Sequence, residues 1–357
     1  MVNRQVNYQD ILKALTFIDK NGVPPNRRST KYNLFRNDKF YPPKYVLSIA
    51  TKIVTGRELE PFQFSGGYET NNFLTKLGFT ILEGSKSLNI PKPKSKSIYI
   101  CTALIQIPLD NWDDVANSDK FELLSNILSN LHKDTDILIL PAGFLNSKNK
   151  RPEIIFDETE KVLTKLIKKF NDNLFICFGI DGRQKKTDQL ALTVNKSGIV
   201  AIARKFHPTE QNKIDKILLA DNPFTKENNK QRDFIIKGKL AYLSVCYDIF
   251  GISKRKLENE NNYDFIIGVI HGFGKRGGDS DFARKGLAGA SKQWKVHSYA
   301  SAVFSDNRNP INWTAGVKWT YGNASVKDFT YDQIRIDSDL KTLKTEIATV
   351  FLRYYHE

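Results

Sequence analysis

Cysteine is scarce in this sequence, with three residues among 357. Cys101, Cys177 and Cys246 are odd in number and form no CxxC pair, which argues against a disulfide scaffold and against a structural zinc site. In a reducing cytoplasm, isolated thiols of this kind stay free, and one of them can act as a nucleophile. We therefore expect a cytoplasmic protein with no metal and no cofactor.

Long apolar runs are also missing. No stretch of about 18 uninterrupted apolar residues occurs, so a membrane span is not expected. The first ten residues, MVNRQVNYQD, lack the apolar core of a signal peptide, so a secretory signal is not expected either. A membrane is accordingly not among the expected partners.

Positive charge is abundant and unevenly distributed. The formal net charge is +15. Residues 1–97 contain 16 Lys/Arg and 7 Asp/Glu, a net +9, whereas residues 98–357 contain 38 and 32, a net +6. A localised positive field attracts polyanions, because neutralising their phosphates releases counterions. The N-terminal segment is therefore a candidate for nucleic-acid contact, and an ordinary solvated basic surface is the alternative.

Residues 1–84 predict a small, basic, mainly helical domain. Apolar residues recur at helical spacing over 11–18, and Pro42 and Pro43 precede a second helical pattern over 45–53. The next segment, SKSLNIPKPKSKS at 85–97, has four Lys, four Ser and two Pro. This composition is typical of an extended linker and marks a domain boundary.

Residues 98–357 alternate between strand and helix patterns. Apolar runs predict strands at 98–107, 136–145, 174–181, 239–251 and 263–272, and amphipathic patterns predict helices at 121–132 and 158–170. Residues 189–206 predict a hairpin that turns at 195–198. A helix rich in small residues, 283–298, leads to a last strand. The fold class is therefore α/β.

Two residues stand where predicted strands end. Cys246 follows LAYLSV at a chain turn, where a nearby positive charge lowers the pKa of a thiol and makes it a nucleophile. Lys205 ends the strand IVAIARKF, from which its ammonium could favour the thiolate and stabilise an oxyanion. The alternatives are a structural cysteine and an ordinary surface lysine. Cys101 and Cys177 fall inside apolar strands, as inert core thiols do.

The motifs RKFHPTE, with Lys205, and VCYDIFG, with Cys246, lie 41 residues apart in an order that resembles the carbon–nitrogen hydrolase (nitrilase-like) superfamily. The resemblance covers about residues 98–325. It implies an α-β-β-α sandwich, which in this family usually dimerises, so a homodimer is expected. It also implies hydrolysis of a non-peptide carbon–nitrogen bond through a Cys246 thioester, with Glu210 as a supporting carboxylate. An amide, nitrile or nucleotide-like small molecule is the expected ligand.

One departure from the family pattern bears directly on activity. The strand-end glutamate that serves as base in the family is replaced by Ala142, which cannot accept a proton. The domain is then either a catalytically inactive ligand-binding sensor, or an enzyme in which Lys205 maintains a standing thiolate, or an enzyme with another base. The candidates for that base are Glu210, Asp248, His207 and His271.

His271 has further support from its position. It ends an apolar strand, where active-site residues of α/β sheets collect. Lys275, Arg276 and Arg284 follow and could hold a phosphate, although the GxxxxGK[ST] order of a Walker A motif is absent. The candidate substrate-binding residues are Tyr247, Asp248, His207 and Phe144.

The N-terminal segment contains VPPNRRSTKYNLF, YPPK, SGG and LGF, which resemble the head domain of McrA-like modification-dependent restriction endonucleases. The resemblance implies recruitment to DNA or to a protein partner, in a bacterial restriction or antiviral defence protein. Interleaved aromatic residues suit base stacking, although they can equally form the core of a small domain. No HNH motif occurs, so nuclease activity is not implied. The candidate nucleic-acid-binding residues are Arg27, Arg28, Lys31, Lys39 and Lys44.

Overall fold

A computed structural model of the chain describes residues 6–29, 31–36, 39–60, 63–64, 67–83, 97–108, 112–148, 150–183, 187–214, 216–273, 281–305, 310–319, 332–333 and 341–357. The chain divides into two compact units. The first comprises Met1–Lys96 with Lys237–Lys239 and Asn259–Asn262, and the second comprises the remainder. The predicted linker, except for Ser97, lies outside the described residues.

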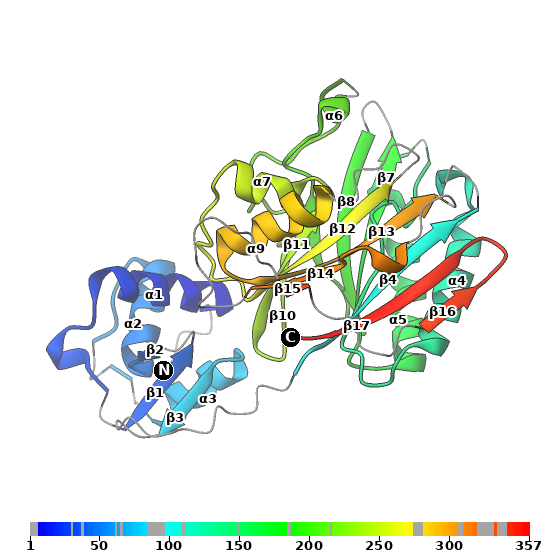
Figure 1. The fold of residues 1–357 in the computed structure, drawn as a ribbon. Helices are drawn as coiled ribbons and strands as arrows, with labels where there is room; N and C mark the ends of the chain where they lie inside the picture. The colour runs from blue at the N-terminus through cyan, green and yellow to red at the C-terminus, as the bar shows by residue number, and fades with distance from the viewer. Residues whose placement is uncertain are drawn as a thin grey trace. The chain divides into compact units, whose positions relative to one another are not determined.

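The N-terminal unit combines three helices with a small sheet (Figure 1). The helices are α1 (Tyr8–Asn21), α2 (Pro43–Thr55) and α3 (Tyr68–Lys76), with a 3-10 turn at Pro25–Arg27. The Asn7 side chain caps α1 by accepting hydrogen bonds from the backbone of Gln9 and Asp10. Helix α2 begins at Pro43, as the sequence predicts, and ends at Gly56 in the left-handed conformation. The prediction of a mainly helical unit is confirmed.

A three-stranded antiparallel sheet in this unit was not predicted in full. Its order is β2-β1-β3, with β1 at Tyr32–Arg36, β2 at Lys39–Tyr41 and β3 at Thr80–Glu83. Of the three, β3 alone follows from sequence, because FSGGYETNNFLTKLGFTIL predicts a glycine turn, a short helix and a closing strand. In β1, Leu34 is fully buried while its four neighbours are half-buried, so the strand is too short and too mixed to show a period of two.

The second unit is built on one large mixed sheet. Its main path runs β10-β11-β12-β13-β4-β5-β7-β8-β9. These strands are β4 (Tyr99–Ile107), β5 (Ile137–Ile139), β7 (Phe175–Arg183), β8 (Thr187–Asn195), β9 (Gly198–Arg204), β10 (Asp233–Ile236), β11 (Lys239–Val245), β12 (Phe265–Phe273) and β13 (His297–Ser305). Further strands are β6 (Leu145–Asn146), β14 (Gly316–Lys318), β15 (Asp332–Gln333), β16 (Lys341–Lys344) and β17 (Thr349–His356).

The helices of this unit connect the strands. They are α4 (Asn117–Asn130), α5 (Phe156–Phe170), α6 (Glu210–Ile214), α7 (Asp248–Lys254) and α9 (Ala288–Trp294), the last preceded by a π-helical segment at Phe282–Leu287. Short 3-10 turns lie at Trp112–Asp114, Pro152–Ile155 and Pro310–Asn312. No helix among the described residues is long and apolar enough to cross a lipid bilayer.

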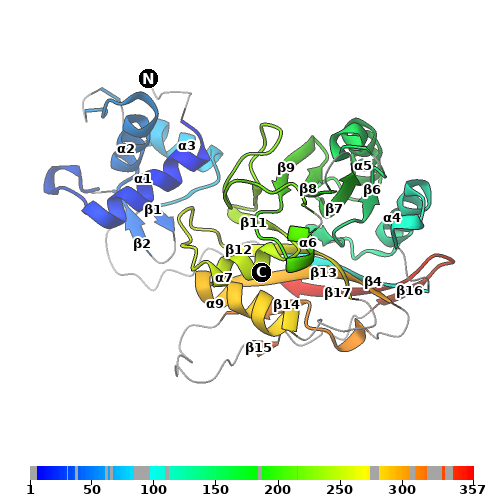
Figure 2. The ribbon, with the colours of Figure 1, turned by 90° about the horizontal axis from the view of Figure 1, so that it is seen from above.

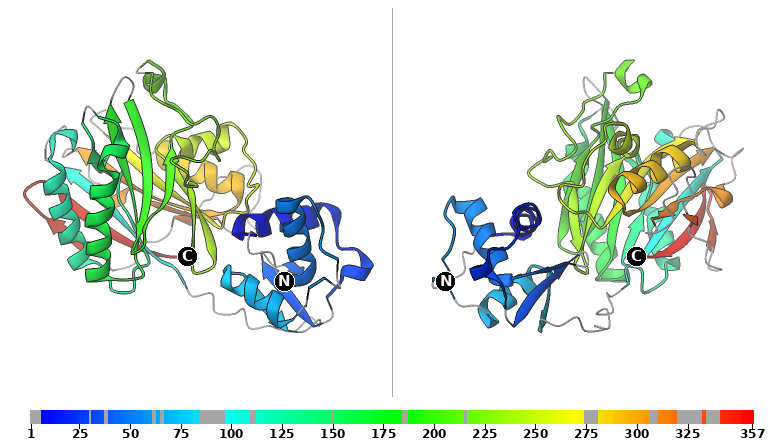
Figure 3. Two further views of the ribbon diagram at one scale, coloured as in Figure 1. Left: turned by 180° about the vertical axis from the view of Figure 1, so that it is seen from behind. Right: turned by 60° about the vertical axis from the view of Figure 1, so that its left-hand side comes forward.

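Strand β4 is the place where the sheet opens into two layers. Its first half pairs with β5 at Ile100–Thr102, its second half pairs with β13 at Ile105–Ile107, and its other edge pairs with β17. The two halves of the sheet turn toward each other, so that the backbone N–H of Ala142 after β5 donates to the carbonyl of Ile270 in β12 (3.0 Å). Helices α4 and α5 cover one outer face and α7 and α9 the other (Figures 2 and 3). The predicted α-β-β-α sandwich is confirmed.

Several predicted boundaries shift for local reasons. The strand expected over 239–251 ends at Val245, because the chain turns at Cys246 and enters α7. The strand expected over 136–145 is regular only at Ile137–Ile139. Cys101 and Cys177 are buried inside β4 and β7, as expected, and burial raises the pKa of both thiols. The C-terminal hairpin of β16 and β17 was not predicted.

Candidate active site

Cys246 occupies the sharp turn between β11 and α7. Its φ is +47°, a left-handed conformation that costs a non-glycine residue roughly 1–2 kcal/mol. The turn is held by a hydrogen bond from the Cys246 backbone N–H to the carbonyl of Val269 in the neighbouring strand (2.6 Å). Such strain persists where the surrounding structure imposes it, and it lifts the side chain clear of the sheet.

Lys205 follows β9 and is almost completely buried, with 1% of its surface exposed. Its Nζ donates to Oε1 of Gln189 (2.9 Å) and to Oδ1 of Asn212 (2.6 Å). Both acceptors are neutral amides, so they fix the ammonium without neutralising its charge. That charge acts on Cys246: burial alone would raise the pKa of the thiol, but Lys205 and His271 together lower it to about 7.

His271 connects Cys246 to a carboxylate. Its Nε2 lies 2.8 Å from Oδ2 and 3.0 Å from Oδ1 of Asp181 in β7. Burial favours the neutral imidazole, but Asp181, followed by Cys246, outweighs burial and raises the pKa of His271 to about 10. A hydrogen bond between His271 and the sulfur also favours the thiolate. Between about pH 7 and pH 10 the pair is therefore a thiolate and an imidazolium.

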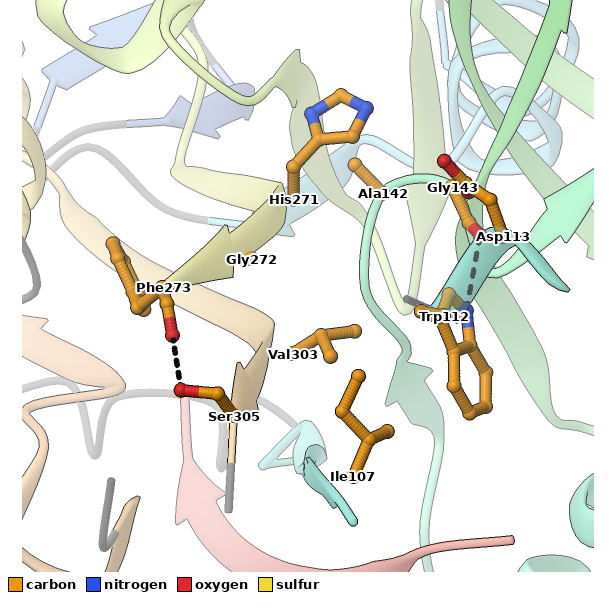
Figure 4. A pocket seen from close by; sticks show the side chains of 10 residues that line it. All are labelled: Ile107, Trp112, Asp113, Ala142, Gly143, His271, Gly272, Phe273, Val303 and Ser305. Atoms are coloured by element: carbon orange, nitrogen blue, oxygen red, sulfur yellow. Dashed lines mark hydrogen bonds between the residues drawn. The ribbon is translucent and has the colours of Figure 1, made fainter. Parts of the chain in front are cut away.

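The His271–Asp181 pair lies beside Ala142, the strand-end position at which the motif pattern predicts a glutamate. Gly143, next to Ala142, has a φ of +59°. A Cβ atom on Gly143 would lie 3.1 Å from Oδ2 of Asp181 and 3.5 Å from Cδ2 of His271. Figure 4 shows the His271 imidazole beside Ala142 and Gly143. An imidazole–carboxylate pair therefore lies next to the strand end at which the sequence has Ala142.

Asp248 joins the turn of Cys246 to the strand end that carries Lys205. It is fully buried, and its Oδ1 accepts from the backbone N–H groups of Phe206 and His207, both at 2.8 Å. Its Oδ2 lies 3.4 Å from Nη1 of Arg232, which is itself buried. Burial raises the pKa of Asp248, and Arg232 opposes that rise. Asp248 was expected to bind substrate, but its oxygens are engaged inside the protein.

The other predicted residues take different places. Glu210 lies on α6, which projects from the sandwich (Figure 1), and its carboxylate is 86% exposed and pairs with Lys213. Phe144 is buried in the core and packs against Trp112. Glu210 is therefore solvated, and Phe144 is a core residue.

His207 and Tyr247 form a stacked pair next to Cys246, with ring centroids 5.8 Å apart and planes inclined by 2°. Burial, followed by Arg255 and Lys254, lowers the pKa of His207 to about 4, so its imidazole is neutral at pH 7. Its Nδ1 accepts from Nε of Arg255 (3.3 Å). His207 is therefore an ineffective proton acceptor at neutral pH.

A cavity of about 210 Å³ opens beside His271. Its apolar walls come from five side chains, and His271, Asp113 and Ser305 add polar groups (Figure 4). Nε1 of Trp112 donates to the carbonyl of Gly143 (3.1 Å) and so fixes the indole as one wall. The lining residues are Ile107, Trp112, Asp113, Ala142, Gly143, His271, Gly272, Phe273, Val303 and Ser305.

Sequence reasoning missed the partners that complete the site. Asp181 ends the apolar run LFICFGID, which is the same strand-end signal that singled out His271 and Cys246. Gln189 and Asn212, which hold Lys205, have no comparable signal, because neutral amides are common at surfaces. Lys275, Arg276 and the Arg284 side chain, expected to hold phosphate, lie outside the described residues.

The basic candidates of the N-terminal unit differ in exposure. Arg27 pairs with Glu58 (3.1 Å) and Glu60 (3.2 Å), and its side chain is only 11% exposed. Lys39 pairs with Asp19. Lys44 is half-buried over the ring of Phe64, whereas Arg28 and Lys31 are exposed. Within the described part of the chain, no three His, Cys, Asp or Glu side chains group as a metal site would require.

Residues 4–83 match the family model of the ScoMcrA-like, N-terminal head domain. No curated protein matches the chain. Similar solved structures include a mutant amidase from Nesterenkonia sp. AN1 with the acetamide moiety of fluoroacetamide added at its active-site cysteine. It is 8% identical, with a TM-score of 0.49 over 74% of this chain and 92% of the amidase. Another mutant of that amidase, described as a nitrilase-superfamily member, is 8% identical, with a TM-score of 0.46 over 58% and 79%.

Proposed function

We propose that the second unit hydrolyses a non-peptide carbon–nitrogen bond of a small amide through a thioester on Cys246. The observation that carries this proposal is the pairing of His271 with Asp181 (2.8 Å) beside a thiol whose pKa Lys205 and His271 lower to about 7. A cysteine, an imidazole and a carboxylate in this order form a nucleophile with an oriented proton carrier. The family resemblance of the RKFHPTE and VCYDIFG motifs supports the same chemistry.

In the first half-reaction, the Cys246 thiolate attacks the amide carbonyl carbon. A C–S bond forms, and the carbonyl π pair moves to oxygen, where the ammonium of Lys205 stabilises the negative charge. When the carbonyl re-forms, the C–N bond breaks and the nitrogen takes the proton of the His271 imidazolium. The amine leaves, and a thioester and a neutral imidazole remain. No general base is needed before attack, so the substitution at Ala142 is compatible with activity.

In the second half-reaction, water attacks the thioester carbon while the neutral imidazole of His271 accepts a proton from that water. A C–O bond forms, the C–S bond breaks, and the thiolate and imidazolium are restored. Asp181 keeps the imidazole oriented and favours its protonated form throughout. The products are a carboxylic acid and an amine or ammonia.

Capture of the acyl group tests this proposal. The protein is incubated with a panel of simple carboxamides, with hydroxylamine added to intercept the thioester as a hydroxamate. We expect hydroxamate and amine from the wild-type protein and none from Cys246→Ala. If the Cys246 thiol is reactive but no amide in the panel gives hydroxamate, while some still bind, the unit is a ligand sensor.

For the N-terminal unit we infer contact with DNA in a bacterial defence protein. The net charge of +9 over residues 1–97, the exposed side chains of Arg28 and Lys31, and the match to the head-domain model support this inference. Arg27 is assigned a structural role because two glutamates already pair with it.

Binding of a labelled DNA duplex, measured between 50 and 200 mM salt, tests the inference. Affinity should fall steeply over that range, since each phosphate contact contributes about −0.9 to the log–log slope. Arg28→Glu combined with Lys31→Glu should abolish binding, and Lys165→Glu combined with Lys168→Glu, at exposed positions of α5, controls for the same change in net charge. Absence of binding at the lowest salt would overturn the inference.

A further inference from the structure

The cavity beside His271 lies at the ends of three strands and is walled mainly by apolar side chains. Ile107 ends β4, Phe273 ends β12 and Val303 lies in β13, and all three line the cavity together with Trp112. Figure 4 shows Trp112 and Phe273 on opposite sides, with Ile107 and Val303 between them. The hydrolytic mechanism makes no use of these apolar walls, which are suited to hold a part of the ligand away from the reacting bond.

The cavity and the nucleophile share strand β12. The turn at Cys246 is tied to this strand by the hydrogen bond from its backbone N–H to the carbonyl of Val269 (2.6 Å). His271, two residues further along the strand, lines the cavity and pairs with Asp181 (2.8 Å). A ligand group in the cavity therefore lies against the imidazole that carries the proton in the proposed reaction.

The two aromatic walls are fixed by their own packing. Nε1 of Trp112 donates to the carbonyl of Gly143 (3.1 Å), and the Lys120 ammonium lies 4.8 Å from the centre of the Trp112 ring. The ring of Phe273 packs against Phe304, with centroids 5.2 Å apart. Both wall residues are buried, so neither ring can swing aside without breaking these contacts. The width of the cavity is therefore set by the fold.

The volume of the cavity, about 210 Å³, fits one ring. An apolar cavity of about 150 Å³ is enough to hold benzene. The remaining space corresponds to about two water molecules, at roughly 30 Å³ each, and suits the carboxamide group that must reach His271. Between walls that do not move apart, this leaves no space for a second fused ring.

The charges of the lining favour an uncharged ligand group over an anionic one. Asp113 contributes a carboxylate, and no lysine or arginine is among the described residues that line the cavity. The imidazole of His271 already pairs with Asp181, and Oγ of Ser305 donates to the carbonyl of Phe273 (3.4 Å). A carboxylate or phosphate on the ligand would therefore meet a like charge and no unpaired cation among those residues, which disfavours its burial.

We propose that this cavity binds the acyl side of the substrate, and that the substrate is an uncharged carboxamide whose carbonyl is attached to a single aromatic ring. The ring lies between Trp112 and Phe273. Ile107 and Val303 limit its depth. Aromatic rings in offset or edge contact gain more than the area they bury would give. This inference deepens the proposed function and rests on it for the thioester, but binding of the ring stands apart from hydrolysis.

Binding is measured by calorimetry in the Cys246→Ala variant of the full chain, in which no thioester can form. Benzamide should bind at least about tenfold more tightly than acetamide, because its ring buries apolar surface that acetamide lacks. 2-Naphthamide and 4-carbamoylbenzoate should each bind at least about tenfold more weakly than benzamide, the first because of its size and the second because of its carboxylate. Equal affinities for benzamide and acetamide, or no binding of benzamide, would overturn the proposal.

Two variants of the lining test the assignment of the walls. Gly272→Ala adds a carbon 3.9 Å from Cβ of Val303, an ordinary contact, and should weaken benzamide about tenfold while acetamide is unaffected. Val303→Ala should admit 2-naphthamide, and Val194→Ala, at a buried valine of β8 outside the lining, controls for lost packing. Equal changes in affinity for benzamide and acetamide would overturn the proposal. The four amides decide it on the parent protein even where a variant fails to fold.

Turnover separates this inference from the proposed function. Wild-type protein with hydroxylamine should form benzohydroxamate from benzamide at lower amide concentrations than it needs to form acetohydroxamate from acetamide. Tight binding of benzamide without any hydroxamate would count against the hydrolase and would leave the ligand class of the cavity standing. Equal binding and equal capture of both amides would leave the hydrolase standing and would overturn the assignment of the cavity.

Discussion

Nε2 of His271 lies 2.8 Å from Oδ2 of Asp181, although the two residues are 90 positions apart in the chain. His271 is on β12 and Asp181 is on β7, which belong to opposite halves of the sheet that diverge at β4. The pair therefore forms only when the two layers of the sandwich are packed together. The groups that lower the pKa of Cys246 therefore meet only in the assembled fold.

Asp181→Asn should weaken the activation of Cys246. Loss of the carboxylate removes the main group that raises the pKa of His271, so the imidazole loses its proton at lower pH and stabilises the thiolate less. We expect the midpoint of the pH profile of Cys246 alkylation by iodoacetamide to rise by about one pH unit. Asp172→Asn, at an exposed aspartate, is the matched control. An unchanged midpoint in a folded Asp181→Asn protein would show that Asp181 does not influence the pKa of the Cys246 thiol.

Asp248→Ala should destabilise the second unit strongly. The change leaves Arg232 buried without its carboxylate and two backbone N–H groups without their acceptor. Removing one partner of a buried pair costs about 3–5 kcal/mol in the free energy of unfolding. Urea denaturation measures this cost, and Asp221→Ala at an exposed site should change stability by about 0.5 kcal/mol or less. Equal stabilities would refute the bridging role of Asp248.

Gly143→Ala should damage the site as well as the fold. Its φ of +59° strains any side chain, and the new Cβ would crowd Asp181 at 3.1 Å. Gly56, in the left-handed helical conformation with a φ of +77° and nothing within 4 Å of a Cβ, provides a control with the backbone strain alone. Both alanine variants should lose about 1 kcal/mol of stability from strain, but only Gly143→Ala should slow alkylation of Cys246. Equal alkylation in both variants would contradict the packing described at Gly143.

Sequence patterns located the strand ends better than they assigned the side chains. Cys246, Lys205 and His271 were singled out because each follows a run of apolar residues, and the ends of buried strands meet at one edge of a sheet. The same patterns do not show in which direction each side chain points. Asp248 is adjacent to Cys246 in sequence yet turns inward to the backbone of Phe206.

Pairings across the two layers could not be predicted, because they depend on how β4 divides the sheet. Asp181 lies beside His271 only because the two halves of the sheet diverge at β4 and pack against each other. The burial of Lys120 was equally unpredictable, because a lysine in the first turn of an amphipathic helix is normally solvated, whereas this one is 0% exposed. Glu210 was favoured by family context, but the short helix α6 carries it out to solvent.

The pH dependence of Cys246 alkylation tests the central claim most directly. With a pKa of about 7 against an ordinary value of 9.0, about half of the thiol is ionised at pH 7 instead of about one part in a hundred. The rate should therefore rise with pH to a plateau above pH 8, with its midpoint near 7. Cys101 and Cys177, buried with raised pKa values, should react far more slowly in the native protein. A midpoint near 9 for Cys246, or equal slow rates for all three cysteines, would contradict an activated nucleophile.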